Sequence, residues 1–127
     1  MVTFQNGLLY SPNFEAIAAT LSDEVYKPTV FDRGRKIIRA GTFITGDFLR
    51  DKSKRAIANY TDDNVVGILL KDTDVTHGPR PVAVLVKGHV NLQKLDKKPT
   101  PAIEDALPQI KFHGNHREYS RFIEQNY

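Results

Sequence analysis

The sequence contains no cysteine, no tryptophan and a single methionine. Without cysteine, a disulfide scaffold, a thiolate nucleophile and every cysteine-based zinc or iron–sulfur site are excluded. Long hydrophobic runs are also missing, because no stretch approaches the roughly 20 apolar residues that cross a bilayer. The residues after Met1 do not form a secretory signal. The sequence therefore predicts a soluble chain that is made in the cytosol.

The length and composition are those of one ordinary globular domain. The chain has 127 residues, of which 40% are hydrophobic and 26% are charged. These proportions are close to the average for folded soluble domains, and they argue against wholesale disorder. No internal repeat or low-complexity tract is present, so solenoid and linker architectures are excluded.

Positive charge is concentrated in the middle of the chain. Residues 31–60 contain eight basic and three acidic residues, a net charge of +5, while the rest of the chain sums to −2. Such a segment is able to contact phosphates, but the interpretation that we favour is a solvated face of a small β domain. Few aromatic residues lie among these cations, so platforms for stacking single-stranded bases are scarce. The basic residues are Arg33, Arg35, Lys36, Arg39, Arg50, Lys52, Lys54 and Arg55.

The first 28 residues predict a short helix. Ser11 is a suitable N-cap, and Pro12 occupies the first helical position, where its missing N–H costs nothing. The apolar residues that follow fall at i, i+3, i+4 and i+7, which is the spacing of one helical stripe. These residues are Phe14, Ile17, Ala18 and Leu21.

From residue 29 the pattern becomes that of β-strands. A turn at residues 32–34 separates two short strand-like segments. Residues 65–70 and 81–86 are nearly continuous apolar runs rich in valine and isoleucine, and such runs of about six residues predict buried strands. Gly88 and the alternation in residues 89–92 predict that the second strand bends and continues.

The end of the chain predicts short helices around one more strand. Thr100 and Pro101 mark the start of a helix, and residues 110–112 have the composition of a returning strand. Asn115 and Glu118 form a capping-box pattern for a final helix, which is too short to be stable without docking.

Motifs for metal binding or catalysis are weak. Asp72 and Asp74 resemble the start of a calcium loop, but His77 and Ala83 stand where that loop requires glycine and glutamate. The sequence has no HExxH pair, no GxSxG elbow, no P-loop and no dinucleotide fingerprint. We therefore expect no enzymatic activity and no catalytic, cofactor-binding or metal-binding residue. A small hydrolase whose triad assembles only in the fold is an open alternative. The histidines are His77, His89, His113 and His116.

Two stretches in the middle of the chain resemble a known family. They are NVVGILLKDTDVTHG, at residues 64–78, and PVAVLVKGHVN, at residues 81–91. Together they are similar to the head decoration proteins of tailed bacteriophages, the family of the lambda decoration protein, in which such a pattern forms the centre of a small β domain. Residues 40–44, AGTFI, fit another element of the family, and residues 99–112 are similar to the ending of related capsid proteins from phages of Gram-positive hosts.

The resemblance implies a mainly β fold with short helices. Outside the matching stretches, the residue patterns predict an N-terminal arm or short helix at residues 1–28 and a C-terminal helical tail at residues 113–127. The resemblance itself predicts a compact β-tulip-like domain at residues 29–112. It implies a structural protein of the virion that binds the outer surface of the major capsid protein shell and stabilises the head, with trimeric self-association. Membranes, cofactors and direct contact with nucleic acid are not expected. The alternative is a small nucleic-acid-binding module that uses residues 33–55.

The apolar leader is the candidate for the capsid contact. An extended leader of this kind adds a strand to an exposed sheet edge of a partner. Many copies acting together stabilise a particle even when each contact is weak. The alternative is that the leader folds back on its own domain. The candidate contact residues are Phe4, Leu8, Leu9, Tyr10 and Phe14.

Overall fold

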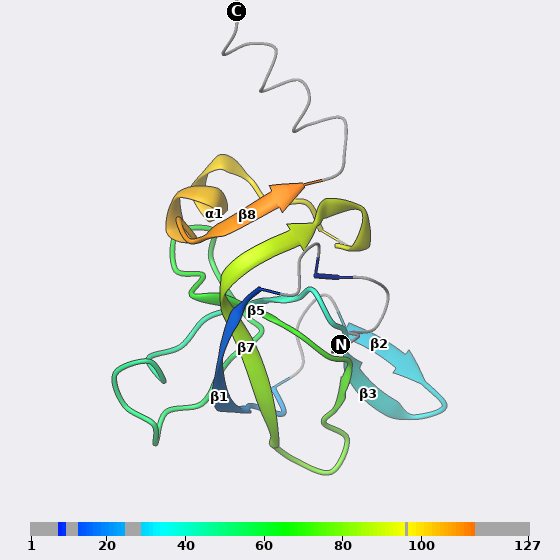
Figure 1. Cartoon of the computed structure of the whole chain (residues 1–127). Helices are drawn as coiled ribbons and strands as arrows, with labels where there is room; N and C mark the ends of the chain where they lie inside the picture. The colour runs from blue at the N-terminus through cyan, green and yellow to red at the C-terminus, as the bar shows by residue number, and fades with distance from the viewer. Residues whose placement is uncertain (1–7, 10–12, 25–28, 96, 114–127) are drawn as a thin grey trace, which may run out of the picture.

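The computed structural model describes residues 8–9, 13–24, 29–95 and 97–113 (Figure 1). Within these residues the protein is mainly β, as the two apolar runs predict, with eight strands, one α-helix and one 3-10 turn. In chain order the elements are β1 (Glu15–Leu21), β2 (Thr29–Asp32), β3 (Arg35–Ile38), β4 (Phe43–Ile44), β5 (Gly67–Leu69), β6 (Thr73–Asp74), β7 (Arg80–Asn91), η2 (Leu92–Lys94), α1 (Pro101–Ala106) and β8 (Ile110–His113).

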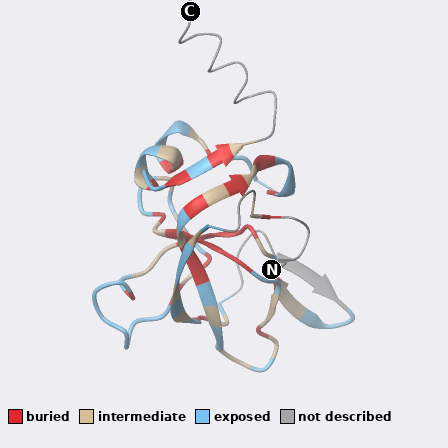
Figure 2. Ribbon diagram, in the orientation of Figure 1, coloured by how far each residue is buried: buried red, intermediate tan, exposed pale blue. Residues whose placement is uncertain are grey.

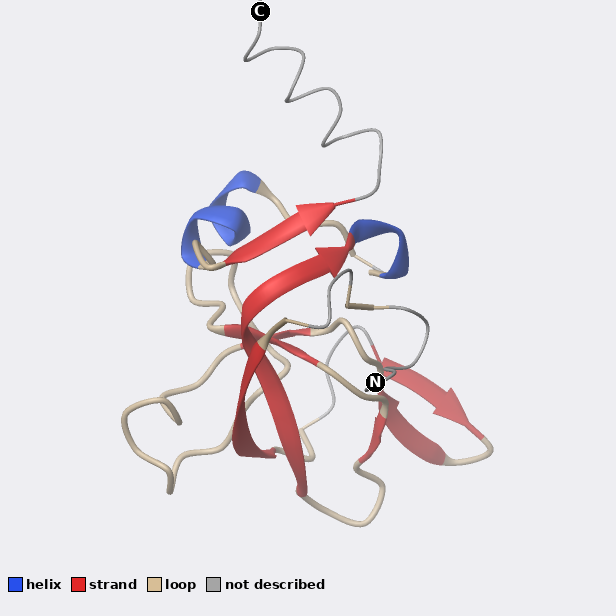
Figure 3. Cartoon of the chain, viewed as in Figure 1, coloured by secondary structure: helices blue, strands red, loops and turns tan. Residues whose placement is uncertain are grey.

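The long strand β7 organises the main sheet, in which the strands follow the order β1-β7-β5-β4 (Figure 3). Its first part pairs antiparallel with β1, from Leu21 opposite Arg80 to Glu15 opposite Lys87. Its last residues pair in parallel with β8, beginning with Gly88 opposite Ile110. The predicted continuation of this strand past Gly88 is therefore confirmed, and one strand joins the two ends of the described chain.

The first residue of β5, Gly67, faces β7 where there is no room for a side chain. A Cβ atom on Gly67 would lie 2.4 Å from Val84 Cγ1 and 2.6 Å from the carbonyl oxygen of Leu85. Real Cβ atoms do not approach other atoms so closely, so only glycine fits here. The two strands then pair with Ile68 opposite Leu85 and Leu69 opposite Val84.

A smaller sheet contains β2, β3 and β6 in the order β2-β3-β6. Strands β2 and β3 form the predicted hairpin, and both residues of its turn have positive φ, 54° at Arg33 and 81° at Gly34. This is the turn geometry whose twist matches that of paired strands. Strand β6 joins β3 through Ile37 opposite Asp74 and Ile38 opposite Thr73.

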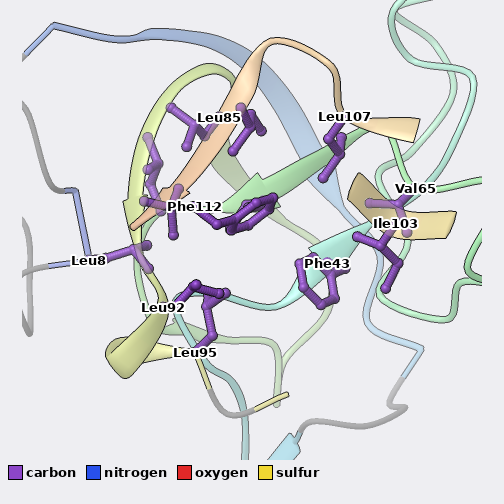
Figure 4. Packing of buried hydrophobic residues seen from close by; sticks show 13 residues of the cluster. Leu8, Phe43, Val65, Leu85, Leu92, Leu95, Ile103, Leu107 and Phe112 are labelled. Carbon is purple, nitrogen blue, oxygen red and sulfur yellow. The ribbon is translucent and has the colours of Figure 1, made fainter. Parts of the chain in front are cut away.

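The core consists of two hydrophobic clusters, and the pair of β5 and β7 contributes to both. Ile68 and Leu85 belong to the first cluster, whereas their neighbours Leu69 and Val84 belong to the second. Alternate residues of a strand point to opposite faces, so the sheet here is buried on both sides (Figure 2). The first cluster (Figure 4) is made of Leu8, Phe43, Val65, Ile68, Leu70, Leu85, Val90, Leu92, Leu95, Ile103, Leu107, Ile110 and Phe112. The second is made of Leu21, Ile38, Ile44, Phe48, Ala56, Ala58, Leu69, Val75 and Val84.

The helix α1 begins where the sequence predicts. The Thr100 hydroxyl oxygen accepts a hydrogen bond from Ile103 N at 3.3 Å, and Pro101 fills the first turn. The same hydroxyl donates to Asp62 Oδ2 at 2.9 Å, which ties the helix to the loop before β5. Ile103 and Leu107 then enter the first cluster, so the helix covers one face of the main sheet.

The helix expected around residues 11–21 is wrong, because residues 15–21 form strand β1. Burial along this strand increases at every second residue, with Ile17 and Ala19 half-buried and Leu21 buried, and its backbone pairs with β7. Ser11 and Pro12 lie outside the described residues. Strand β1 lies before the boundary expected between residues 28 and 29, and it pairs with β7 in the main sheet.

The other expected boundary lies between residues 112 and 113. His113 ends β8, where the helical tail was expected to begin at residue 113. The predicted strand at residues 110–112 is confirmed, and its partner is the second part of β7. The final helix expected around Asn115 and Glu118 lies outside the described residues.

Replacing Gly67 by alanine is expected to lower the free energy of unfolding by about 1–3 kcal/mol, because the new methyl group overpacks the gap between β5 and β7. Chemical denaturation measures the change. In a Val84→Ala background, Gly67→Ala should lower the free energy of unfolding by a smaller amount. The reason is that Val84 Cγ1, one of the two atoms that the new methyl group would meet, is then absent. Strictly additive effects of the two substitutions would contradict the close approach of the strands.

Candidate functional site

The leader residues expected to contact a capsid pack against this chain's own core. Leu8 is 1% exposed and belongs to the first cluster, and its carbonyl oxygen accepts from Asn91 N at 2.8 Å. Leu9 forms a bridge to Val90, and both Leu9 and Phe14 are partly buried against the same cluster.

This packing leaves Leu8 little surface to offer a partner, because its side chain is buried in the core, and its contact with a capsid stays a prediction. It favours the folded-back alternative for Leu8, Leu9 and Phe14. Phe4 and Tyr10 lie outside the described residues.

The basic residues of segment 33–55 do not share one surface. Arg33, Arg35 and Arg39 are exposed on or just after the β2–β3 hairpin, whereas residues 50–55 are exposed in the loop that follows β4. The hairpin and this loop project on opposite sides of the molecule (Figure 1). The structure therefore divides the positive charge between two separate projections, and it provides no continuous basic groove along residues 33–55.

The carboxylates that resemble a calcium loop bind backbone groups of the chain itself. Asp72 Oδ1 accepts from Ala40 N at 2.7 Å. Asp74 Oδ1 accepts from Thr76 N at 2.9 Å and from the Thr76 hydroxyl, which in turn accepts from Lys36 N at 2.8 Å. Hydrogen bonds from Thr76 lower the pKa of Asp74 below its ordinary value. Across the described ranges, no three histidine, aspartate or glutamate side chains gather as a possible metal site.

A surface cleft of about 800 Å³ lies where β5, β6 and the start of β7 meet. Its charged lining residues are Lys71, Asp72, Asp74 and Arg80, and Thr73 adds a hydroxyl that donates to the carbonyl oxygen of Lys71 at 3.0 Å. The cleft lining contains no histidine, serine or cysteine. It therefore contains no nucleophile and base of the kind that a hydrolase triad requires.

The described serines have structural hydrogen bonds. Ser22 Oγ accepts from Glu24 N at 3.2 Å, and Ser53 Oγ donates to Asp51 Oδ1 at 2.7 Å. Neither bond involves a histidine, so these two serines do not begin a triad. Ser11 and Ser120 lie outside the described residues.

A pair of histidines joins β7 to β8, and sequence reasoning missed it. His89 Nδ1 and His113 Nε2 are 2.6 Å apart, and the ring centroids are 4.8 Å apart with 26° between the planes. One ring nitrogen donates and the other accepts, so the pair adds a side-chain link to the parallel strand pairing. The other histidines are not part of it, since His77 is exposed in a turn and His116 lies outside the described residues.

Comparisons of the chain with protein-family models, with curated proteins and with solved structures found no match. Among the described residues, no helix has the length and apolar character to cross a membrane. The function is therefore argued from the sequence resemblance together with the packing and surface described above.

Replacing Leu8 by alanine is expected to lower the free energy of unfolding by about 2–5 kcal/mol, because it leaves a cavity in the first cluster. The matched control is Leu49→Ala, at a leucine that is 47% exposed, where the expected change is within about 0.5 kcal/mol. Denaturant unfolding of both variants gives the comparison. Equal stability of the Leu8 variant and the unsubstituted protein would restore the free-arm alternative.

Lowering the pH should reduce the free energy of unfolding, partly because Asp74 becomes protonated. A carboxyl group whose pKa is lowered by folding stabilises the fold above its unfolded pKa of about 4, and this contribution disappears as the pH falls through the folded pKa. Thr76→Val removes the hydroxyl that lowers the pKa, so the loss of stability below about pH 4 should become shallower. Thr73→Val is the control, because its hydroxyl donates to a carbonyl and not to a carboxylate. An unchanged acid dependence in the Thr76 variant would contradict this role.

Proposed function

We propose that this chain is a head decoration protein of a tailed bacteriophage, which binds the outer surface of the major capsid protein shell and stabilises the head. The observation that carries the proposal is the position of the two stretches that resemble the family. Residues 64–78 include β5 and β6, and residues 81–91 lie in β7. The pair of β5 and β7 lies between the two core clusters, which matches the central place of this pattern in the family.

The packing of the described residues supports a structural role. A decoration protein needs a firm body that holds its outer surface in one shape, and it needs no chemistry. The main sheet is covered on both faces by buried side chains, which gives such a body. On a shell, many identical copies act together, so contacts that are individually weak still stabilise the particle.

The finer features of the proposal follow from the family resemblance. They are a β-tulip-like arrangement of the domain, association as trimers, a place on the outside of the virion after synthesis in the bacterial cytoplasm, and no enzymatic activity. The nucleic-acid-binding alternative has less support, because the cations at residues 33–39 and 50–55 lie on separate projections.

The proposal is tested with empty, expanded and undecorated heads of the phage that encodes the chain. The purified protein should co-sediment with these heads to saturation and raise their resistance to heat. It should bind a short DNA duplex only weakly at about 0.15 M salt, since the cations of residues 33–55 lie on two separate projections. Absence of head binding, together with submicromolar duplex affinity that falls steeply with salt, would replace the proposal by the nucleic-acid alternative.

A further inference from the structure

The loop between β4 and β5 projects from the sheet, and the two ends of residues 46–56 lie side by side. Thr45 and Ile57 exchange two backbone hydrogen bonds, both 2.9 Å long, just before and just after residues 46–56. The chain ends of the loop touch, since a Cβ atom on Gly46 would lie 2.6 Å from the carbonyl oxygen of Arg55. A surface loop of this length with adjoining ends is a compact Ω-type loop, a class that is frequently functional. Figure 1 shows it in turquoise, to the left of β1.

The inside of this loop holds it in one shape. Phe48 is 3% exposed and belongs to the second cluster, so it anchors the loop to the core. The amides of Arg50 and Asp51 both donate to the carbonyl oxygen of Asp47, at 3.1 and 3.0 Å. Asp51 Oδ1 accepts from Ser53 N at 3.0 Å and from Ser53 Oγ at 2.7 Å. The loop is therefore already held in shape before any partner binds, so binding costs little further conformational entropy.

The outside of the loop combines an apolar side chain with positive charge. Leu49 follows the buried Phe48, and at 47% exposure it is the exposed large hydrophobic residue among those the structure describes. The four basic residues that follow Leu49 in the loop are also exposed: Arg50, Lys52, Lys54 and Arg55.

The two carboxylates of the loop offset this charge only in part. Asp47 lies 4.0 Å from the Arg50 side chain, which is 88% exposed. Asp51 is turned toward Ser53, whose hydrogen bonds lower its pKa and keep it ionised. The loop therefore keeps a net positive charge beside Leu49.

We infer that residues 46–55 form a docking element for an acidic protein surface that has an apolar pocket for Leu49. This inference rests on the proposed function, under which that surface is the outer face of the shell protein. An apolar anchor within a charged rim is the usual arrangement of a protein interface, in which the anchor provides affinity and the rim provides steering.

The same features fit other polyanions less well. Phosphate contacts use cations but leave an apolar tip without a partner, and the one aromatic residue of the loop, Phe48, is buried and cannot stack on a base. Insertion into a lipid surface relies on a broad apolar face, whereas this loop exposes one leucine. Complementary charge and a pocket for one leucine therefore point to a protein partner.

The test compares two loop variants with a matched control on the empty, expanded heads used above. The variants are Leu49→Ala and the double substitution Lys52→Glu with Lys54→Glu. The control is Lys94→Glu with Lys111→Glu, which makes the same charge change at exposed positions of η2 and β8. Thermal unfolding should be unchanged in the Leu49 variant, because its side chain is not part of the core.

We expect each loop variant to bind heads about tenfold or more weakly than the unsubstituted protein, and the control to bind as tightly as before. The lysine variant should also lose most of the salt dependence of association. If the loop variants and the control all bind heads with full affinity, the proposed decoration function is unaffected, and the docking role of the loop is overturned. If the unsubstituted protein does not bind heads, the proposed function itself fails. Loop-dependent binding to a short DNA duplex, or to phosphatidylserine vesicles, in place of heads would show that the partner class is wrong.

Discussion

The fold depends on the pairing of β5 with β7, where one short strand and one long strand lie between two hydrophobic clusters. Ile68 and Leu85 point into one cluster while Leu69 and Val84 point into the other, so four residues connect both halves of the core. The pairing needs a residue without a side chain at position 67, because Val84 and the backbone of Leu85 occupy that space. Strands β1, β4 and β8 extend the sheet around this pair, and β3 and α1 contribute buried side chains to the clusters on its two faces.

Segments from both ends of the described chain close the first cluster. Leu8 enters it beside Val90, and Phe112 enters it from β8 on the second part of β7. A leader used in this way stabilises its own domain, and the same side chains are then not free to hold a partner. Under the proposed function, attachment to a shell would then use surfaces that remain exposed when the core is complete, such as the projecting loop after β4.

Sequence patterns predicted those elements that are determined by residues close together in the chain. The turn at Arg33 and Gly34, the Thr100 cap and the two apolar runs each carry their signal within a few residues. Strand β1 was missed because positions 17 and 21 satisfy both a helical and an alternating pattern. Their partners on β7, Val84 and Arg80, which decide between the two patterns, are 67 and 59 residues away. The His89–His113 pair and the division of the basic segment are likewise products of long-range pairing, which single-sequence periodicity does not contain.

The polar side chains of the described region explain why surface shape carries more functional information than any chemical motif. Asp72 binds the amide of Ala40 and Asp62 binds the Thr100 hydroxyl, so these two carboxylates connect segments that are distant in the sequence. Asp74 binds Thr76, two residues further on, and fixes the turn there. A carboxylate held by its own backbone stabilises a connection and is poorly placed to take up an outside ligand. In the loop after β4, Asp51 plays the same part by fixing the turn at Ser53, and it thereby leaves Leu49 and the lysines as the groups that face outward. These acidic side chains hold the shapes of the loops, while the cations and Leu49 of the loop after β4 are exposed, which is the basis of the docking role proposed for it.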